Sequence, residues 1–160
     1  MPDSVDVLLA SSSPVVPSAP MPLYAHPGDA GADLIAAQAC VLEPGQRATV
    51  GTGVSIALPD GYVAFIVPRS GLASKHGITV VNTPGTVDAG YRGEIRVILL
   101  NTDTAVAYSV AVGDRIAQLI VMPVSRARFV PVTHLPGSHR GDAGFGSSGY
   151  SASNPRKGES

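Results

Sequence analysis

Short runs of apolar and β-branched residues, separated by turn residues, cover most of the chain. No long stretch with a 3.6-residue period competes with them, so the pattern is typical of an all-β sandwich or barrel. Tripeptides such as Glu43-Pro44-Gly45 and Pro59-Asp60-Gly61 suit β-turns with proline at the second position. The expected strands are residues 47–50, 54–58, 62–67, 78–81, 95–100, 108–112, 116–121 and 129–132.

One short helix is expected among these strands, over residues 70–76. Ser70 is its expected N-cap, because a serine side chain can accept a hydrogen bond from a free amide of the first turn. Gly77 is expected just past its C-terminus, where a residue with positive φ often ends a helix.

The two ends of the chain lack this strand pattern. Residues 11–22 are rich in serine and proline and predict an irregular loop. From Pro136 onward glycine and serine dominate, which favours a flexible arm with residues 150–160 disordered. The expected organisation is an N-terminal segment at 1–22, a β-barrel domain at 23–135 and a C-terminal arm at 136–160.

Composition narrows the class of protein. The chain has 160 residues, of which 44% are hydrophobic and 14% charged, and this favours one folded domain. The net charge of −1 argues against nucleic acid as a partner, although a local group of donors could still bind a small phosphorylated ligand. No apolar run approaches the roughly 20 residues of a membrane span, so no membrane contact is expected. A single cysteine, Cys40, excludes an internal disulfide and fits a cytoplasmic location.

Five glycine-rich segments between the predicted strands carry the candidate chemistry. Each places charged or hydroxyl side chains beside glycine, which lets the backbone approach a ligand and point its amides at an anion. The segments are DAGADL at 29–34, PRSGLA at 68–73, NTPGTVDAGYRGEI at 82–95, GDRIAQL at 113–119 and RGDAGFGSSG at 140–149.

The second and fifth segments both suit an anion. Ser70 at a helix start, with Arg69 before it, offers amides, a hydroxyl and a guanidinium. The alternative is a plain helix cap with a surface arginine. In the fifth segment an arginine and two serines suit a terminal phosphate, and Phe145 suits stacking on a flat ring. The alternative there is a glycine- and serine-rich tail without a ligand.

The third segment offers a carboxylate and a phenol just before a buried strand. Asp88 suits a general base or a group that holds a water molecule, and Tyr91 suits a wall beneath a ring-shaped substrate. The alternative is structural: Asp88 would bond turn amides and Tyr91 would cap the core.

Taken in order, from Asp29 to Gly149, the five segments resemble the five motifs of the homotrimeric deoxyuridine triphosphatases (dUTP nucleotidohydrolases). The resemblance implies an all-β, jelly-roll-like subunit with one short helix, assembled as a homotrimer whose flexible C-terminal arm closes over a neighbour's site. It implies hydrolysis of dUTP to dUMP and pyrophosphate with Mg²⁺, which removes dUTP from the nucleotide pool and supplies the dTMP precursor dUMP.

The resemblance also implies roles for individual residues. Asp88 would orient the attacking water, and Tyr91 would pack under the deoxyribose and leave no room for a 2′-hydroxyl. A β-hairpin over residues 82–91 would read uracil, and Asp33 would support the metal indirectly, through water or the triphosphate. The implied substrate-binding residues are Arg69, Ser70, Gly71, Asn82, Gly85, Thr86, Val87, Asp88, Tyr91, Arg96, Gln118, Arg140, Phe145, Gly146, Ser147 and Ser148.

Two other functions compete with this one. A dCTP deaminase of the same fold would call for a second serine in place of Gly71 and a deaminating glutamate, for which Glu94 is available. Tyr91 and the complete fifth segment favour the phosphatase instead. A non-catalytic trimeric module that signals by protein contacts is the other alternative, and an intact Asp88 argues against it.

Overall fold

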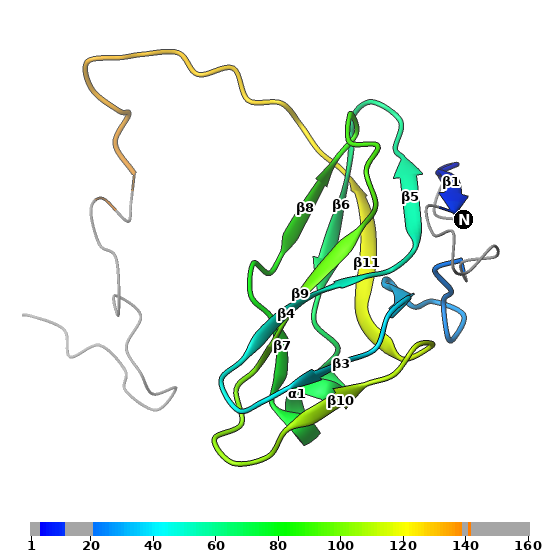
Figure 1. Cartoon of the computed structure of the whole chain (residues 1–160). Coiled ribbons are helices and arrows are strands. Elements are labelled where there is room, and N and C mark those ends of the chain that lie inside the picture. Colours follow the sequence, from blue (N-terminus) through cyan, green and yellow to red (C-terminus); the bar gives the residue numbers. More distant parts are fainter. Residues whose placement is uncertain (1–3, 12–20, 139–140, 142–160) are drawn as a thin grey trace, which may run out of the picture. The chain divides into compact units, whose positions relative to one another are not determined.

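The computed structural model describes residues 4–11, 21–138 and 141 (Figure 1). The chain divides into two units, Met1–Arg126 and Ala127–Ser160. The regular elements in the described part of the first unit are all strands, apart from one short helix. Its elements are β1 (Leu8–Ser11), β2 (Ala32–Ile35), β3 (Cys40–Leu42), β4 (Arg47–Gly51), β5 (Val54–Ala57), β6 (Tyr62–Val67), α1 (Ser70–His76), β7 (Ile78–Val80), β8 (Gly85–Asp88), β9 (Arg96–Asn101), β10 (Tyr108–Val110) and β11 (Arg115–Pro123).

All the strand pairs are antiparallel, and most join segments far apart in the sequence. A four-stranded sheet has the order β2-β11-β6-β8, and a three-stranded sheet has the order β4-β9-β7. Two-stranded pairs β1-β5 and β10-β3 complete the unit. This is the all-β, jelly-roll-like subunit that the sequence predicts.

The core is formed by apolar residues of several strands, since successive side chains of a strand point to opposite faces and one face is buried. In β9, Val97 and Leu99 are buried while Arg96 between Ile95 and Val97 is exposed. Asn101 at the end of β9 is also fully buried, and its amide donates to the carbonyl oxygens of Leu42 and Val106. This pairing removes the cost of burying a polar group and ties β9 to the β3 and β10 region.

Most of the predicted elements are confirmed within a residue or two. The helix Ser70–His76 is confirmed, and Gly77 ends it with φ 64°. The predicted N-cap is wrong: Arg69 holds that position in an extended conformation, no side chain caps the helix, and Ser70 is already helical. Four short strands were not predicted: β1, β2, β3 and β8. β1, β2 and β8 include alanine, glycine, serine or aspartate, which carry little β-propensity, and β3 has only three residues.

The predicted strand at 129–132 is wrong. Residues 127–138 of the second unit, and residue 141, form no helix or strand, and Phe129 is 92% exposed. An apolar run can favour an extended backbone, but a strand also needs a partner, and the described part of this unit provides none. The expected disorder at 150–160, and most of the fifth glycine-rich segment, lie outside the described residues.

No helix in the described ranges is long and apolar enough to cross a membrane.

Candidate active site

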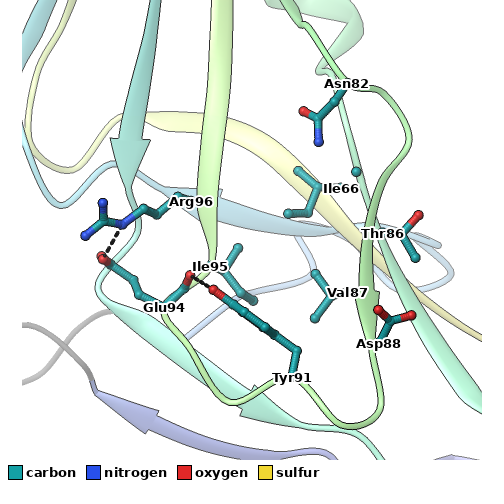
Figure 2. A pocket seen from close by; sticks show the side chains of 10 residues that line it. Ile66, Asn82, Thr86, Val87, Asp88, Tyr91, Glu94, Ile95 and Arg96 are labelled. Carbon is teal, nitrogen blue, oxygen red and sulfur yellow. Dashed lines mark hydrogen bonds and ion pairs between the residues drawn. The ribbon is translucent and has the colours of Figure 1, made fainter.

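A cavity of about 200 Å³ opens between β6, β8 and the start of β9 (Figure 2). Its lining combines apolar side chains with an amide, two carboxylates, a phenol and a guanidinium. The lining residues are Ile66, Asn82, Gly85, Thr86, Val87, Asp88, Tyr91, Glu94, Ile95 and Arg96. Seven of the predicted substrate-binding residues are therefore brought together here: Asn82, Gly85, Thr86, Val87, Asp88, Tyr91 and Arg96.

Strand β8 forms one wall of the cavity. It pairs with β6, with Gly85 opposite Ile66 and Asp88 opposite Val63. A side chain at Gly85 would meet the Nδ2 atom of Asn82 at 3.2 Å, so glycine gives Asn82 the space it occupies. The predicted β-hairpin over residues 82–91 is wrong, because this segment contains one strand, β8, whose partner is β6.

The turn after β8 fixes Tyr91. Its amide donates to the carbonyl oxygen of Asp88 at 3.0 Å, and its hydroxyl donates to the carbonyl oxygen of Glu94 at 2.9 Å (Figure 2). A Cβ atom at Gly93 would lie 2.7 Å from Cζ of Tyr91, so the ring packs directly over this glycine. Tyr91 keeps 46% of its surface exposed and can present one face to a ligand.

Asp88 sits beside this ring at the end of β8 and is exposed. Its carboxylate has no hydrogen-bonding or ionic partner within the described residues. The alternative in which the Asp88 side chain bonds turn amides is therefore not supported by the described contacts. Only the backbone carbonyl oxygen of Asp88 takes part in the turn. A carboxylate without a partner at the edge of a cavity can hold a water molecule or accept a proton.

A second group of predicted residues lies at Asp33, on the same sheet but outside the lining of this cavity. Asp33 is only 5% exposed and its two carboxylate oxygens contact Arg69 and Arg115, each at 3.1 Å. The contact with Nε of Arg69 is an ion pair without hydrogen-bond alignment, since neither atom has a hydrogen-bond partner in the described structure. Nη1 of Arg69 instead donates to the carbonyl oxygen of Arg115 at 3.1 Å.

The strand register explains how this charged group forms. Gln118 on β11 lies opposite Asp33 on β2 and opposite Val67 on β6, two residues before Arg69. Gln118 also packs over Gly31, where an added Cβ would come within 3.0 Å of its own Cβ. Ser70 and Gly71 follow in the exposed first turn of α1. The fold thus brings Asp33, Arg69 and Gln118 together, and their roles toward a ligand stay predictions.

Arg115 and Glu94 belong to these sites although the sequence reasoning assigned neither to dUTP binding. Arg115 lies in the glycine-containing segment GDRIAQL, and this position could have marked it as a candidate anion-binding residue. The predicted residues Arg140, Phe145, Gly146, Ser147 and Ser148 lie outside the described residues, so their roles stay predictions.

The residues described here offer no cage of three or more His, Cys, Asp or Glu side chains for a metal ion. Both oxygens of Asp33 already contact guanidinium groups, which leaves it poorly suited to direct coordination. Magnesium binds proteins through few carboxylates and keeps several waters or phosphate oxygens. The donor set therefore fits a magnesium ion carried by a triphosphate, and an indirect role of Asp33 toward the metal stays a prediction.

Comparison with known proteins points to one family. The model of the dUTPase family matches residues 17–149. The chain is 69% identical over 150 residues to the deoxyuridine 5′-triphosphate nucleotidohydrolase of Leifsonia xyli subsp. xyli, covering 94% of each chain. It is 66% identical to the enzyme of the same name from Thermobifida fusca, covering 83% of this chain and 74% of the relative.

Solved structures agree with this match. A dUTPase variant of Staphylococcus bacteriophage 80alpha with dUpNHpp superposes with a TM-score of 0.83 at 29% identity, over 91% of this chain and 99% of the phage protein. A variant of the dUTPase from phage phi11 of S. aureus, described with a structural Mg(II) ion, gives a TM-score of 0.74 at 27% identity, over 82% and 99% of the two chains.

Proposed function

The chain belongs to the dUTPase family, and on that premise we propose how its residues carry out the reaction. It is a dUTP diphosphatase that hydrolyses dUTP to dUMP and pyrophosphate. The main support for these residue roles is that one cavity is lined by both a fixed aromatic ring, Tyr91, and an exposed carboxylate, Asp88.

The cavity bounded by Ile66, Val87 and Ile95 receives the nucleoside. These apolar side chains suit the faces of the base and sugar, and the amide of Asn82 with nearby backbone groups pairs with the uracil edge. Tyr91 packs under the deoxyribose. A ribose 2′-hydroxyl would have to enter the space that the ring occupies, so UTP is disfavoured. Cytosine would leave polar groups of the site unpaired, and such unpaired groups can favour the correct substrate over its analogue by a factor of about 10⁴.

Asp88 orients the water that attacks the α-phosphorus. The water oxygen forms a bond to phosphorus, its proton passes to the Asp88 carboxylate, and the bond between the α-phosphorus and the bridging oxygen breaks. Pyrophosphate leaves with that oxygen and dUMP remains. A positioned general base contributes about 10² to 10⁴ in rate, and positioning supplies much of the rest in phosphoryl transfer.

The triphosphate is held by cationic and amide donors. Arg69, Ser70, Gly71 and Gln118 supply guanidinium, hydroxyl and amide groups around one end of β6 and β11. Mg²⁺, when bound, neutralises charge that develops on the phosphates. Asp33 keeps Arg69 and Arg115 in place and assists the metal indirectly. The arm residues Arg140, Phe145, Gly146, Ser147 and Ser148 close over the γ-phosphate and the base.

We propose that the chain forms a homotrimer, and the distribution of these groups in one chain supports sites shared between copies. Asp88 lies opposite Val63 at one end of β6, whereas Arg69 follows the other end, about 20 Å away along a strand that rises roughly 3.3 Å per residue. One triphosphate cannot easily bridge that distance, so a neighbouring copy would supply the phosphate-binding group. Exposed apolar side chains, including Leu8 and Tyr24 in the first unit and Phe129 and Leu135 in the second, provide surface for such contacts.

We also infer a cytoplasmic location, where dUTP and reduced Cys40 would both be found. The test of the function is pyrophosphate release from dUTP by the purified chain with Mg²⁺, beside dCTP, dTTP and UTP. We expect strong preference for dUTP. Ammonia release from dCTP would support a deaminase instead, and no turnover of any nucleotide would favour a non-catalytic module.

A further inference from the structure

Glu94 has both carboxylate oxygens engaged at the rim of the nucleoside cavity. Oε1 accepts a hydrogen bond from the amide of Gly53 at 2.9 Å. Oε2 pairs with Nε of Arg96 at 3.0 Å (Figure 2). The Glu94 side chain is 23% exposed, so this carboxylate is a partly buried link between the β4–β5 turn and the first residue of β9.

The backbone leaves space for this link. Gly51 lies directly opposite Arg96 in the β4–β9 ladder. A Cβ atom at Gly51 would come within 2.6 Å of Oε1 of Glu94, so any larger residue there would displace the carboxylate. The carbonyl oxygen of Glu94 also accepts the Tyr91 hydroxyl. A single residue thus connects the turn, the cavity wall and the arginine.

Arg96 has a free face beyond this contact. Its side chain is 64% exposed, and within the described structure only Nε has a partner. The two Nη groups can therefore donate to an anion while Glu94 holds the guanidinium. Arg96 is also the only cation that lines the cavity among the described residues, against the carboxylates Asp88 and Glu94. An anionic substrate group near Asp88 needs such a cation to offset repulsion.

We propose that Glu94 is a positioning residue that fixes the Arg96 guanidinium at the cavity rim, where its Nη groups contact the α-phosphate of the bound nucleotide. This rests on the proposed function of the cavity. Glu94 does not act as a proton carrier, because an amide and a guanidinium already occupy its oxygens. Its effect is on binding: it keeps a flexible side chain in one orientation before the nucleotide arrives.

The test compares Glu94→Gln, Arg96→Ala, the double variant and Gly51→Ala with the parent chain. Glu94→Gln keeps an acceptor for the Gly53 amide but removes the charge that holds Arg96. We expect KM for dUTP to rise about three- to tenfold with kcat within about twofold, as for loss of binding shared by the ground and transition states. Gly51→Ala should reproduce this by displacing the carboxylate. The double variant should have the same KM for dUTP as Arg96→Ala, because the two substitutions remove the same interaction.

Equilibrium binding of dUMP and of deoxyuridine separates positioning from general damage. Glu94→Gln should weaken dUMP binding by the same factor as KM and leave deoxyuridine binding unchanged. Arg47→Ala is the matched control, since it removes an exposed arginine from the far end of the β4–β9 ladder and should change nothing. Unchanged dUMP binding in Glu94→Gln, or equal losses for dUMP and deoxyuridine, would overturn the proposal. Absence of dUTP hydrolysis by the parent chain would refute the proposed function alone, because the binding comparison needs no turnover.

Discussion

Replacing Gly93 by alanine should damage the site while leaving the fold nearly intact. The new Cβ would stand 2.7 Å from Cζ of Tyr91 and 3.1 Å from Cε2, and closer still to the hydroxyl oxygen. Ordinary van der Waals contact begins near 3.4 Å, so the ring must move by at least the 0.7 Å difference. The backbone at Gly93 is not in the left-handed region, so the strain is confined to this contact.

The cost in stability should be small. Moving the ring breaks the hydrogen bond from Tyr91 to the carbonyl oxygen of Glu94, worth about 0.5–1.5 kcal/mol. Since Tyr91 is 46% exposed, the ring can swing toward solvent without leaving a core cavity. We therefore expect the free energy of unfolding to fall by about 1 kcal/mol and Tm by about 2–4 °C for a chain of this length.

The cost in function should be larger. A displacement approaching 1 Å in a group that positions substrate can cost about 10²-fold in rate. We expect kcat/KM for dUTP to fall by about 10- to 100-fold. Selectivity for dUTP over UTP should fall as well, because the ring would no longer fill the space of the 2′-hydroxyl.

The assay measures pyrophosphate release from dUTP and from UTP, with thermal unfolding of the same samples. Gly90→Ala is the matched control: it lies in the same loop, has no atom within 4 Å of an added Cβ, and should behave like the parent. Parental activity and selectivity in Gly93→Ala would refute the role given to Tyr91. Equal damage in Gly90→Ala would show that the loop, and not the ring, is responsible.

Catalysis, assembly and the C-terminal arm can each be tested separately. Asp88→Asn should bind dUTP normally while kcat falls by about 10² or more, and near-normal turnover would remove Asp88 from catalysis. Light scattering of the purified chain should give about three times the 16.3 kDa of one chain, whereas a monomer with full activity would contradict shared sites. Deleting residues 140–160 should keep the assembly and dUMP affinity but sharply lower kcat/KM for dUTP, because ordering the arm requires the γ-phosphate; undiminished activity after deletion would show that the arm is not a lid.

Residues that are neighbours in the sequence determined the fold class and the family. Strand 62–67 was predicted correctly because its β-branched and aromatic residues set a local preference that burial then reinforces. Gly77 marked the helix end because positive φ is a local requirement that glycine meets at little cost. The five glycine-rich segments indicated the dUTPase family because their residues and their order can be read directly from the sequence.

Tertiary structure alone decided which of these segments meet. β2 and β8 are strands because β11 and β6 pair with them, and not because of their own short sequences. The absent strand at 129–132 shows the reverse case, a strong local preference without a partner among the described residues.

The site depends on such long-range contacts. Asp33 meets Arg115, 82 residues away, and Glu94 meets Gly53, 41 residues away. No local pattern encodes these pairs, since they form when burial of the apolar strands brings distant backbones into register. The sequence could therefore identify Asp88 and Tyr91 as candidates. Only the folded chain could show that Gly93 fixes the ring of Tyr91, and that Gly51 leaves space for the carboxylate that holds Arg96.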